Sequence, residues 1–433
     1  MTSKIKKNQL NMVMPQDSPV HNWYRFVLSF PPHLVRDYLA KLGADEHSVV
    51  LDPFCGTGTT LVECKKLGIR SCGWEANAMA HFASTTKTSW QCDPDHFIAH
   101  CQQVAEEALD MTARSGISLY GDTPLFGDFR GGTMLRDLTE EQWQVLSRGF
   151  ISPLPLHRTL ILLETMRGYQ ANPYRGYQEL ALAKALVSRI GNVAFGPEIG
   201  ATPPKSDIDV VSIWLSECKN IAHDLEIVQK LPYHPDSSVI RGDSRSTQSH
   251  AKLFDIVITS PPYPNEKDYT RTTRLESVIL GFITNRSDLR ALKQGLLRSN
   301  TRNVYTVDDD QKWIEGVESV QTLARQIEER RIELGKTSGF ERLYHRVVEL
   351  YFGGMARHLI ELKKTLKPGA QLAYVVGDQM SYFRIPIRTG TILADIAERV
   401  GYKVESIDLF RTRLATVTKE WIREEVVVLS SSA

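Results

Sequence analysis

The chain has 433 residues, of which 42% are hydrophobic and 24% are charged. At roughly 150 residues per domain, this length predicts two or three domains, or one domain with large insertions, and it allows a sizeable core. Fifty-two Lys and Arg residues nearly balance 51 Asp and Glu residues, so the formal charge is +1. The composition therefore excludes a histone-like polyelectrolyte, but not a local basic groove.

Features that direct a chain to a membrane or an oxidising compartment are missing from the sequence. No apolar run approaches the roughly 18–20 residues that span a bilayer. The segment Met1 to Gln16 lacks the apolar stretch of a signal peptide. Six cysteines in so long a chain do not predict a disulfide framework. We expect a soluble, cytoplasmic protein with free thiols.

The first elements along the chain predict a parallel sheet. Residues 1–21 are polar and contain two prolines, which is typical of a loose arm. The pattern then predicts a helix over 33–42, a strand over 48–51, a glycine-rich turn, a helix over 59–67 and a strand over 69–74. A strand, a helix and a second strand in such close succession form a βαβ unit, and βαβ units build parallel sheets.

Two mostly helical segments interrupt this alternation. The first covers 77–237, and the second, which is charged, covers 264–343. Around them we expect strands over 239–243, 255–259, 371–376, 403–409 and 425–429, helices over 344–366 and 391–400, and a turn at 367–369. The predicted fold is a doubly wound, Rossmann-like α/β sheet of about seven strands with two large helical insertions. Its core comprises 22–76 and 238–433.

The first segment that indicates chemistry is LDPFCGTGTT at 51–60. Gly56 and Gly58 let the backbone approach a ligand at the carboxyl end of a strand, where open α/β sheets bind ligands. Glu75, at the end of the next strand, suits a ribose diol. A tight structural turn is the alternative. Thr59 stands where a phosphate-binding loop would need Lys.

The second segment is ITSPPY at 258–263. Its two prolines fix an extended, rigid backbone after a buried strand. Ser260 supplies a hydroxyl group, and Tyr263 supplies an aromatic face that can stack on a planar ring. A proline-rich partner motif would look similar in isolation, but the position after a strand favours a binding site.

These two segments resemble motifs of the amino-methylating DNA methyltransferases. Residues 52–60 look like that family's S-adenosylmethionine motif, and 260–263 are similar to its catalytic motif in the form commonest among cytosine-N4 enzymes. Residues 30–32 (FPP) resemble the segment that closes over the cofactor. The resemblance covers 22–76 and 238–276 well and 344–429 more loosely, and it implies the sheet of an S-adenosylmethionine-dependent methyltransferase.

The resemblance also implies roles for individual residues. Asp52 and the 55–58 turn would face the methionine part of the cofactor, Glu75 its ribose and Asp243 its adenine amine. The implied cofactor contacts are Phe30, Asp52, Phe54, Cys55, Gly56, Gly58, Glu75 and Asp243. The implied catalytic residues are Ser260, Pro261, Pro262 and Tyr263.

The chemistry supports these catalytic roles. The Ser260 hydroxyl and the Pro261 carbonyl can accept both N–H bonds of an exocyclic amine and aim its lone pair at a methyl group. Tyr263 would stack on the base after it has flipped out of the duplex. Carbon-5 methylation of cytosine needs the thiolate of a Pro-Cys dipeptide, which this chain lacks.

Basic residues are concentrated after the catalytic motif. Residues 267–302 contain eight Lys or Arg and three Asp or Glu. We expect DNA contacts from Lys267, Arg271, Arg274, Arg298 and Arg302. A solvated helical surface is the alternative. By its size, the 77–237 insertion is expected to recognise the target sequence. Its histidines and cysteines match no zinc spacing, so no metal is expected.

Together these features predict a site-specific methyltransferase that acts on N4 of cytosine in double-stranded DNA. The expected setting is a restriction-modification system, with a cognate endonuclease acting separately. Adenine-N6 methylation of DNA is an alternative, because the same geometry supports it. Guanine-N2 methylation of transfer RNA is another, because those enzymes share a similar cofactor turn, although they usually have Asp before Pro-Pro-Tyr. A DNA-binding module with a vestigial cofactor pocket is disfavoured, because the key positions are intact. Most cytosine-N4 enzymes have the catalytic half first, whereas the cofactor motif comes first here.

Overall fold

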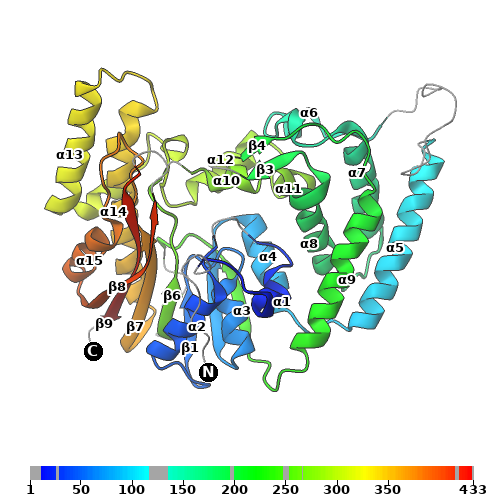
Figure 1. The fold of residues 1–433 in the computed structure, drawn as a ribbon, viewed down its shortest axis with the longest axis horizontal. Helices are drawn as coiled ribbons and strands as arrows, with labels where there is room; N and C mark the ends of the chain where they lie inside the picture. Colours follow the sequence, from blue (N-terminus) through cyan, green and yellow to red (C-terminus); the bar gives the residue numbers. More distant parts are fainter. Residues whose placement is uncertain are drawn as a thin grey trace.

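The computed structural model describes residues 11–25, 29–116, 135–195, 199–246, 253–265, 267–414 and 419–431. Its main sheet has seven strands in the order β5-β2-β1-β6-β7-β9-β8 (Figure 1). The strands are β1 (Val49–Asp52), β2 (Arg70–Glu75), β5 (Ser237–Arg241), β6 (Phe254–Thr259), β7 (Leu366–Gly377), β8 (Tyr402–Leu414) and β9 (Trp421–Ser431). This sheet confirms the predicted Rossmann-like α/β fold.

The strand directions locate a switch point in the middle of the sheet. Strands β5, β2, β1, β6 and β7 run parallel, and β9 lies antiparallel to both β7 and β8. From β1 the chain builds outward through β2 to β5 and then returns to β6 on the other side of β1. In doubly wound sheets, ligands bind at the carboxyl ends of the strands beside such a switch point.

Helices cover both faces of the sheet because successive strand residues point to opposite sides. Val50 and Ile256 pack with α2 (Pro32–Lys41) and α3 (Thr59–Lys66) on one face. Leu51 and Val257 pack with α14 (Tyr344–Lys363) on the other face, together with α13 (Glu318–Glu333) and α15 (Thr389–Arg399). The 3.6-residue apolar spacing that predicted α2 and α14 corresponds to these buried stripes.

The first insertion forms a helical lobe (Figure 1). The buried side chains of this lobe form a separate apolar core. Its helices are α4 (Ala78–Thr88), α5 (Pro94–Arg114), α6 (Glu140–Trp143), α7 (Pro153–Gly168), α8 (Arg175–Ala185) and α9 (Val210–Val228). Helix α4 also packs on β2 and β5, so it joins the lobe to the sheet. Sequence analysis missed the small hairpin of β3 (Val193–Phe195) and β4 (Ile199–Ala201).

The second insertion is divided between the two cores. Helices α11 (Arg274–Ile279) and α12 (Arg286–Gln294), which follow α10 (Tyr269–Thr272), contribute buried side chains to the helical lobe. The later part, through α13, packs on α14 beside the sheet. The chain between α12 and α13 therefore crosses from the lobe to the sheet domain, and it passes the carboxyl ends of the strands.

Two local predictions differ from the structure. The described residues of the expected loose arm are partly packed, because buried His21 bonds Glu63 (Nε2–Oε1 2.7 Å) and Asp17 forms an ion pair with Arg36 (2.9 Å). The expected turn at 367–369 lies inside β7 as an irregularity, since Leu366 pairs with Phe254 but the next paired residue is Gln371.

Candidate functional site

Asp52 ties the two motif segments together at the centre of the sheet. Strands β1 and β6 are hydrogen-bonded neighbours. The Asp52 carboxylate accepts hydrogen bonds from Thr259 Oγ1 (2.6 Å), Thr60 Oγ1 (2.6 Å) and the Phe54 amide (3.1 Å). Burial raises the pKa of Asp52 to about 6, against these hydrogen bonds. Asp52 is fully buried and joins the glycine turn to β6, rather than lining the space above them.

The glycine turn has a left-handed backbone at both of its glycines. Gly56 has φ 52° and Gly58 has φ 83°, and Gly58 caps the start of α3. A Cβ atom at Gly58 would lie 3.0 Å from the Cβ of Ser84 on α4. Cys55 lies within the turn, where burial raises the pKa of its thiol. A protonated, buried thiol packs as a small apolar group and is not a nucleophile.

Glu75, at the end of β2, holds the other side of the turn. Its carboxylate accepts hydrogen bonds from the amides of Gly56 (2.8 Å) and Asn77 (2.7 Å). Desolvation raises the pKa of Glu75 to about 7 in spite of these bonds. A ligand that donates to this carboxylate would favour its ionised form.

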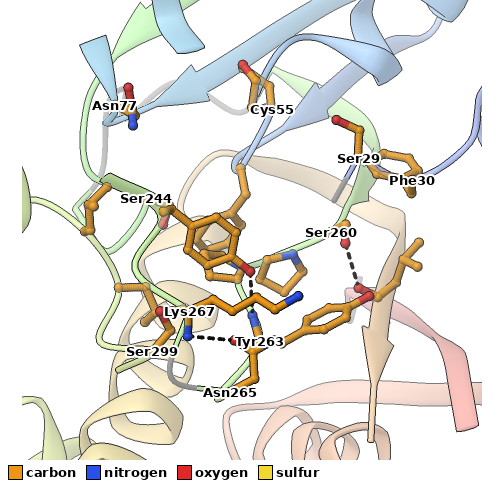
Figure 2. Close-up of a pocket in the computed structure, with 18 of the residues that line it drawn as sticks. Ser29, Phe30, Cys55, Asn77, Ser244, Ser260, Tyr263, Asn265, Lys267 and Ser299 are labelled. Atoms are coloured by element: carbon orange, nitrogen blue, oxygen red, sulfur yellow. Dashed lines mark hydrogen bonds between the residues drawn. The ribbon is translucent and has the colours of Figure 1, made fainter. Parts of the chain in front are cut away.

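A pocket of about 590 Å³ opens above these strand ends. Residues predicted as site residues contribute much of its wall, namely Phe30, Phe54, Cys55, Gly56, Glu75, Ser260, Pro261, Pro262, Tyr263 and Lys267. In Figure 2, Cys55 and Asn77 lie on one side of this space, and Tyr263, Asn265 and Lys267 lie on the other. The geometry thus brings the glycine turn and the SPPY segment to a single pocket.

The SPPY segment forms a rigid corner of the pocket. Ser260 donates a hydrogen bond from Oγ to the Val375 carbonyl (3.2 Å), which leaves the lone pairs of Oγ available as acceptors (Figure 2). The Tyr263 amide donates to the Tyr269 hydroxyl (3.5 Å). The Tyr263 ring packs so closely on Gly377 that a Cβ atom there would lie 3.1 Å from Tyr263 Cε2.

Residues of β8 and β9 complete this part of the wall, and sequence analysis missed them. Glu424 accepts hydrogen bonds from Arg411 (Nη2–Oε1 2.9 Å) and is paired with Arg413 (3.2 Å), and all three line the pocket. Burial raises the pKa of Tyr263, and the charge of Glu424 adds to the increase. These residues belong to no local motif, so only the sheet order brings them to the site.

The crossing between α12 and α13 forms the opposite wall. Gly295, Leu296, Leu297, Ser299 and Asn303 line the pocket there, close to Gly242 and Ser244 at the end of β5. The side-chain nitrogen Nδ2 of Asn300 donates to the Lys267 carbonyl (3.1 Å), which links this wall to the chain that follows the SPPY segment. The basic residues of this insertion predicted DNA contacts, and no local pattern in its sequence indicates that it lines a pocket.

Asp243 lies beside the pocket rather than on its wall. Arg245 donates to both oxygens of its carboxylate (Nη2–Oδ2 2.7 Å, Nε–Oδ1 3.0 Å) and also to Asp310 (Nη1–Oδ2 2.6 Å). At the end of β5, the lining residues are Gly242 and Ser244. An adenine contact from Asp243 remains a prediction, and it competes with this ion pair. Gly58 is likewise absent from the lining.

The predicted DNA-contact residues occupy three environments. Lys267 lines the pocket, whereas Arg271 is half-buried and Arg302 is exposed. The structure corrects the expectation for Arg274 and Arg298, which are buried and hydrogen-bonded within the protein. Arg274 donates to the Val145 carbonyl (2.9 Å), and Arg298 pairs with Asp308 (2.7 Å). A surplus of basic residues in sequence did not reveal which ones the fold would bury.

The described residues show neither a metal cluster nor a membrane-spanning helix. Within the ranges given above, three or more His, Cys, Asp or Glu side chains do not converge as metal ligands. No helix in those ranges has the length and apolar character needed to cross a membrane.

Comparisons with known proteins agree with this geometry. A family model described as DNA methylase, for N6 and N4 enzymes, matches residues 3–84. The Type II methyltransferase M.BsoBI of Geobacillus stearothermophilus is 24% identical over 464 aligned residues, which cover 100% of this chain and 88% of that protein. The Type II methyltransferase M.AvaI of Nostoc sp. is 34% identical over 160 residues, which cover 36% of this chain and 32% of that protein.

The chain also aligns with a solved structure, that of the rRNA methyltransferase aviRa from Streptomyces viridochromogenes. The alignment covers 99% of this chain and 94% of the aviRa chain, at 9% sequence identity and a TM-score of 0.33. That similarity is too low to support the fold, which is defined by the strand order of the sheet. The sequence matches support the family that the two motifs resembled. Together, the family-model match and the Type II relatives support an amino-methylating DNA methyltransferase family, of the N4 or N6 type, for this chain.

Proposed function

We propose that this protein is a site-specific DNA methyltransferase that transfers a methyl group from S-adenosylmethionine to N4 of a flipped cytosine in double-stranded DNA. The observation that carries the proposal is the single pocket shared by the glycine turn, Glu75 and the SPPY corner. Family membership alone allows an N4 or an N6 amine as the acceptor. The serine that begins the catalytic motif favours cytosine.

The pocket residues fit S-adenosylmethionine. A volume of about 590 Å³ lies within the range of roughly 300–1,000 Å³ that small-molecule sites occupy. Glu75 offers carboxylate oxygens to the ribose hydroxyl groups, and Phe30 and Phe54 offer apolar surface. Two lining groups, Thr57 Oγ1 and Trp74 Nε1, have no hydrogen-bond partner in the described parts of the chain. We assign the cofactor to Phe30, Phe54, Cys55, Gly56 and Glu75.

Bound S-adenosylmethionine supplies an electrophilic methyl group on a sulfonium. The protein holds and orients the target amine. Ser260 Oγ, whose hydrogen is directed to the Val375 carbonyl, accepts one N–H bond of the target amine, and the Pro261 carbonyl accepts the other. Both contacts draw the amine lone pair out of conjugation with the ring and aim it at the methyl group. Pro262 keeps the corner rigid, and Tyr263 stacks on the base.

The proposal includes how DNA is held. The flipped base must enter the pocket, because the amine is inaccessible within the base stack. Arg302 and Arg271 are assigned to phosphate contacts, and the helical lobe of 77–237 is assigned to target recognition. A modification enzyme of a restriction-modification system needs this sequence selectivity, and the two Type II relatives are similar in sequence. The nuclease of such a system acts separately.

One experiment tests the reaction. The protein is incubated with methyl-deuterated S-adenosylmethionine and unmethylated phage DNA, and the DNA is then digested to nucleosides for mass spectrometry. The proposal predicts deuterated N4-methyldeoxycytidine. Label in N6-methyldeoxyadenosine alone would refute the choice of base and leave the family assignment intact. Label in transfer RNA but not in DNA would refute the proposed substrate.

A further inference from the structure

Lys267 occupies an unusual position for a lysine. It follows the SPPY corner by four residues and lines the pocket, where it is half-buried. Its amide donates to Asn265 Oδ1 (3.2 Å), and its carbonyl accepts from Asn300 Nδ2 (3.1 Å), so its backbone is fixed on both sides. Figure 2 shows its side chain extending toward Tyr263 and Ser260.

The amine of Lys267 is unpaired as far as the described residues are concerned. Among the residues that the structure describes, no hydrogen bond or ion pair reaches Lys267 Nζ, whereas the nearby Lys293 bonds Asp268 (Nζ–Oδ2 2.9 Å). Burial lowers the pKa of Lys267, and the charge of Arg413 lowers it further. A partly desolvated cation without a partner is unfavourable for the free protein. Such a group is suited to an acceptor that arrives with a ligand.

The chemistry of the pocket restricts that acceptor. A lysine ammonium has three donors and no acceptor, so it cannot hold the amine of the target base. That amine already has acceptors in Ser260 Oγ and the Pro261 carbonyl. Lys267 must therefore meet the acceptor atoms next to the amine. On the Watson–Crick edge of cytosine these are N3 and O2, whereas adenine presents N1 and then a C–H group.

We propose that Lys267 donates hydrogen bonds to the N3–O2 edge of the flipped cytosine and thereby favours cytosine over adenine. This inference rests on the proposed N4 activity, and it moves Lys267 from a phosphate contact to a base contact. A pocket that is built to donate to O2 rejects a base without that oxygen, because the buried donor is then left unpaired. Ser260 positions the amine, and Lys267 identifies the base that carries it.

The test compares two substitutions of this residue with a remote control. Lys267→Met keeps the aliphatic stem and removes the donors, and Lys267→Arg keeps donors. Lys403→Met is the control, because exposed Lys403 lies near the start of β8, at the end of the sheet away from the pocket. The substrates are unmethylated phage DNA and S-adenosylmethionine. The readouts are kcat/KM, the ratio of N4-methylcytosine to N6-methyladenine, and the Kd for S-adenosylhomocysteine.

We expect Lys267→Met to lower kcat/KM about 10- to 100-fold, as for the loss of a hydrogen bond from a charged donor. The product ratio should shift toward N6-methyladenine, and the Kd for S-adenosylhomocysteine should stay the same. Lys267→Arg should restore part of the rate and of the ratio. Lys403→Met should match the wild type in every readout.

Other results would overturn the inference. A weaker Kd for S-adenosylhomocysteine in Lys267→Met would indicate a contact with the cofactor carboxylate. Uniformly weaker DNA binding, with the salt slope reduced by about 1, would indicate a phosphate contact. Unchanged kinetics and product ratio would exclude any contact. The wild-type product tests the proposed function separately: N6-methyladenine alone refutes the cytosine assignment and this contact together, whereas N4-methylcytosine with an unaffected Lys267→Met refutes only the contact.

Discussion

The ionisation of Glu75 predicts how cofactor affinity depends on pH. Its pKa is raised to about 7 by desolvation. Hydroxyl groups of a bound ribose would donate to the carboxylate, which favours the ionised form, so binding lowers this pKa and releases a proton. With a pKa of about 7, roughly a tenth of the carboxyl groups are ionised at pH 6 and roughly nine-tenths at pH 8. The affinity should therefore be about tenfold weaker at pH 6 than at pH 8.

The substitution Glu75→Gln isolates this group. Glutamine has one acceptor oxygen, and its amide nitrogen must face either a ribose hydroxyl or one of the backbone amides of Gly56 and Asn77. The lost charged hydrogen bond is worth roughly 1.5–3 kcal/mol, which corresponds to about a 10- to 100-fold increase in Kd at pH 8. The variant should also lose the pH dependence between pH 6 and 8, whereas Glu329→Gln, on exposed α13, should retain it.

Isothermal titration calorimetry with S-adenosylhomocysteine measures both effects. Repeating the titration at pH 6.5 in buffers of different ionisation enthalpy reports the proton that binding releases. A wild-type affinity that does not change between pH 6 and 8 would refute the role of Glu75. A Glu75→Gln variant that keeps the wild-type slope would assign the pH dependence to another group, such as Asp52, whose pKa is raised to about 6.

Three further predictions concern the pocket walls and the contrast between Arg298 and Arg302. Gly377→Ala should displace the Tyr263 ring, since the new Cβ would lie 3.1 Å from Tyr263 Cε2. We expect kcat to fall at least tenfold and S-adenosylhomocysteine binding to be unchanged. An unchanged kcat would show that the position of the ring does not matter. Ser260→Ala should lower kcat by about 100-fold, comparable to the loss of one preorganised polar contact, and leave the cofactor Kd unchanged. Single-turnover kinetics measures the rate of methyl transfer. An equal loss in rate and in cofactor affinity would argue against a role at the amine. Arg298→Met should lower the free energy of unfolding by about 3–5 kcal/mol, because it leaves the buried carboxylate of Asp308 without its ion pair. Arg302→Met should leave stability unchanged and weaken DNA binding with a smaller salt slope. Urea denaturation measures the first effect and binding titrations the second, and an Arg298→Met variant of wild-type stability would contradict the burial argument.

The parts of the fold that local patterns specify could be predicted from the sequence. The βαβ unit around Gly56 and Gly58 needs only strand and helix periodicity and a turn that glycine permits. The SPPY corner follows a buried strand, and two parallel strands that end beside a switch point must present their loops to the same space. The meeting of 53–57 with 260–263 therefore follows from sheet topology.

The rest of the site depends on contacts between distant segments, which leave no local pattern. The wall at 295–303 lies in the crossing between two cores, and nothing in its sequence marks it as part of a pocket. Arg411 and Glu424 meet because β8 pairs with β9 beyond the end of β7. Burial is equally hidden: Arg298 and Arg302 look alike in sequence, yet one pairs with Asp308 in the interior and the other is exposed.

Asp52 shows how a correct motif can give an incomplete role. Its position before the glycine turn suggested a cofactor contact, because the motif follows a strand end. In the structure its oxygens accept from two threonines and a backbone amide, and it is fully buried. It acts on the pocket by fixing β1 against β6. A sequence motif reports that a residue type is required, but not whether its side chain faces the ligand.

A crystal structure with S-adenosylhomocysteine and duplex DNA tests the shared pocket most directly. The account predicts the cofactor product against 53–57 with its ribose at Glu75, and an extruded cytosine in the same cavity with N4 at Ser260 Oγ and its ring on Tyr263. A target base that stays stacked in the duplex, or that enters a different cavity from the cofactor, would contradict it.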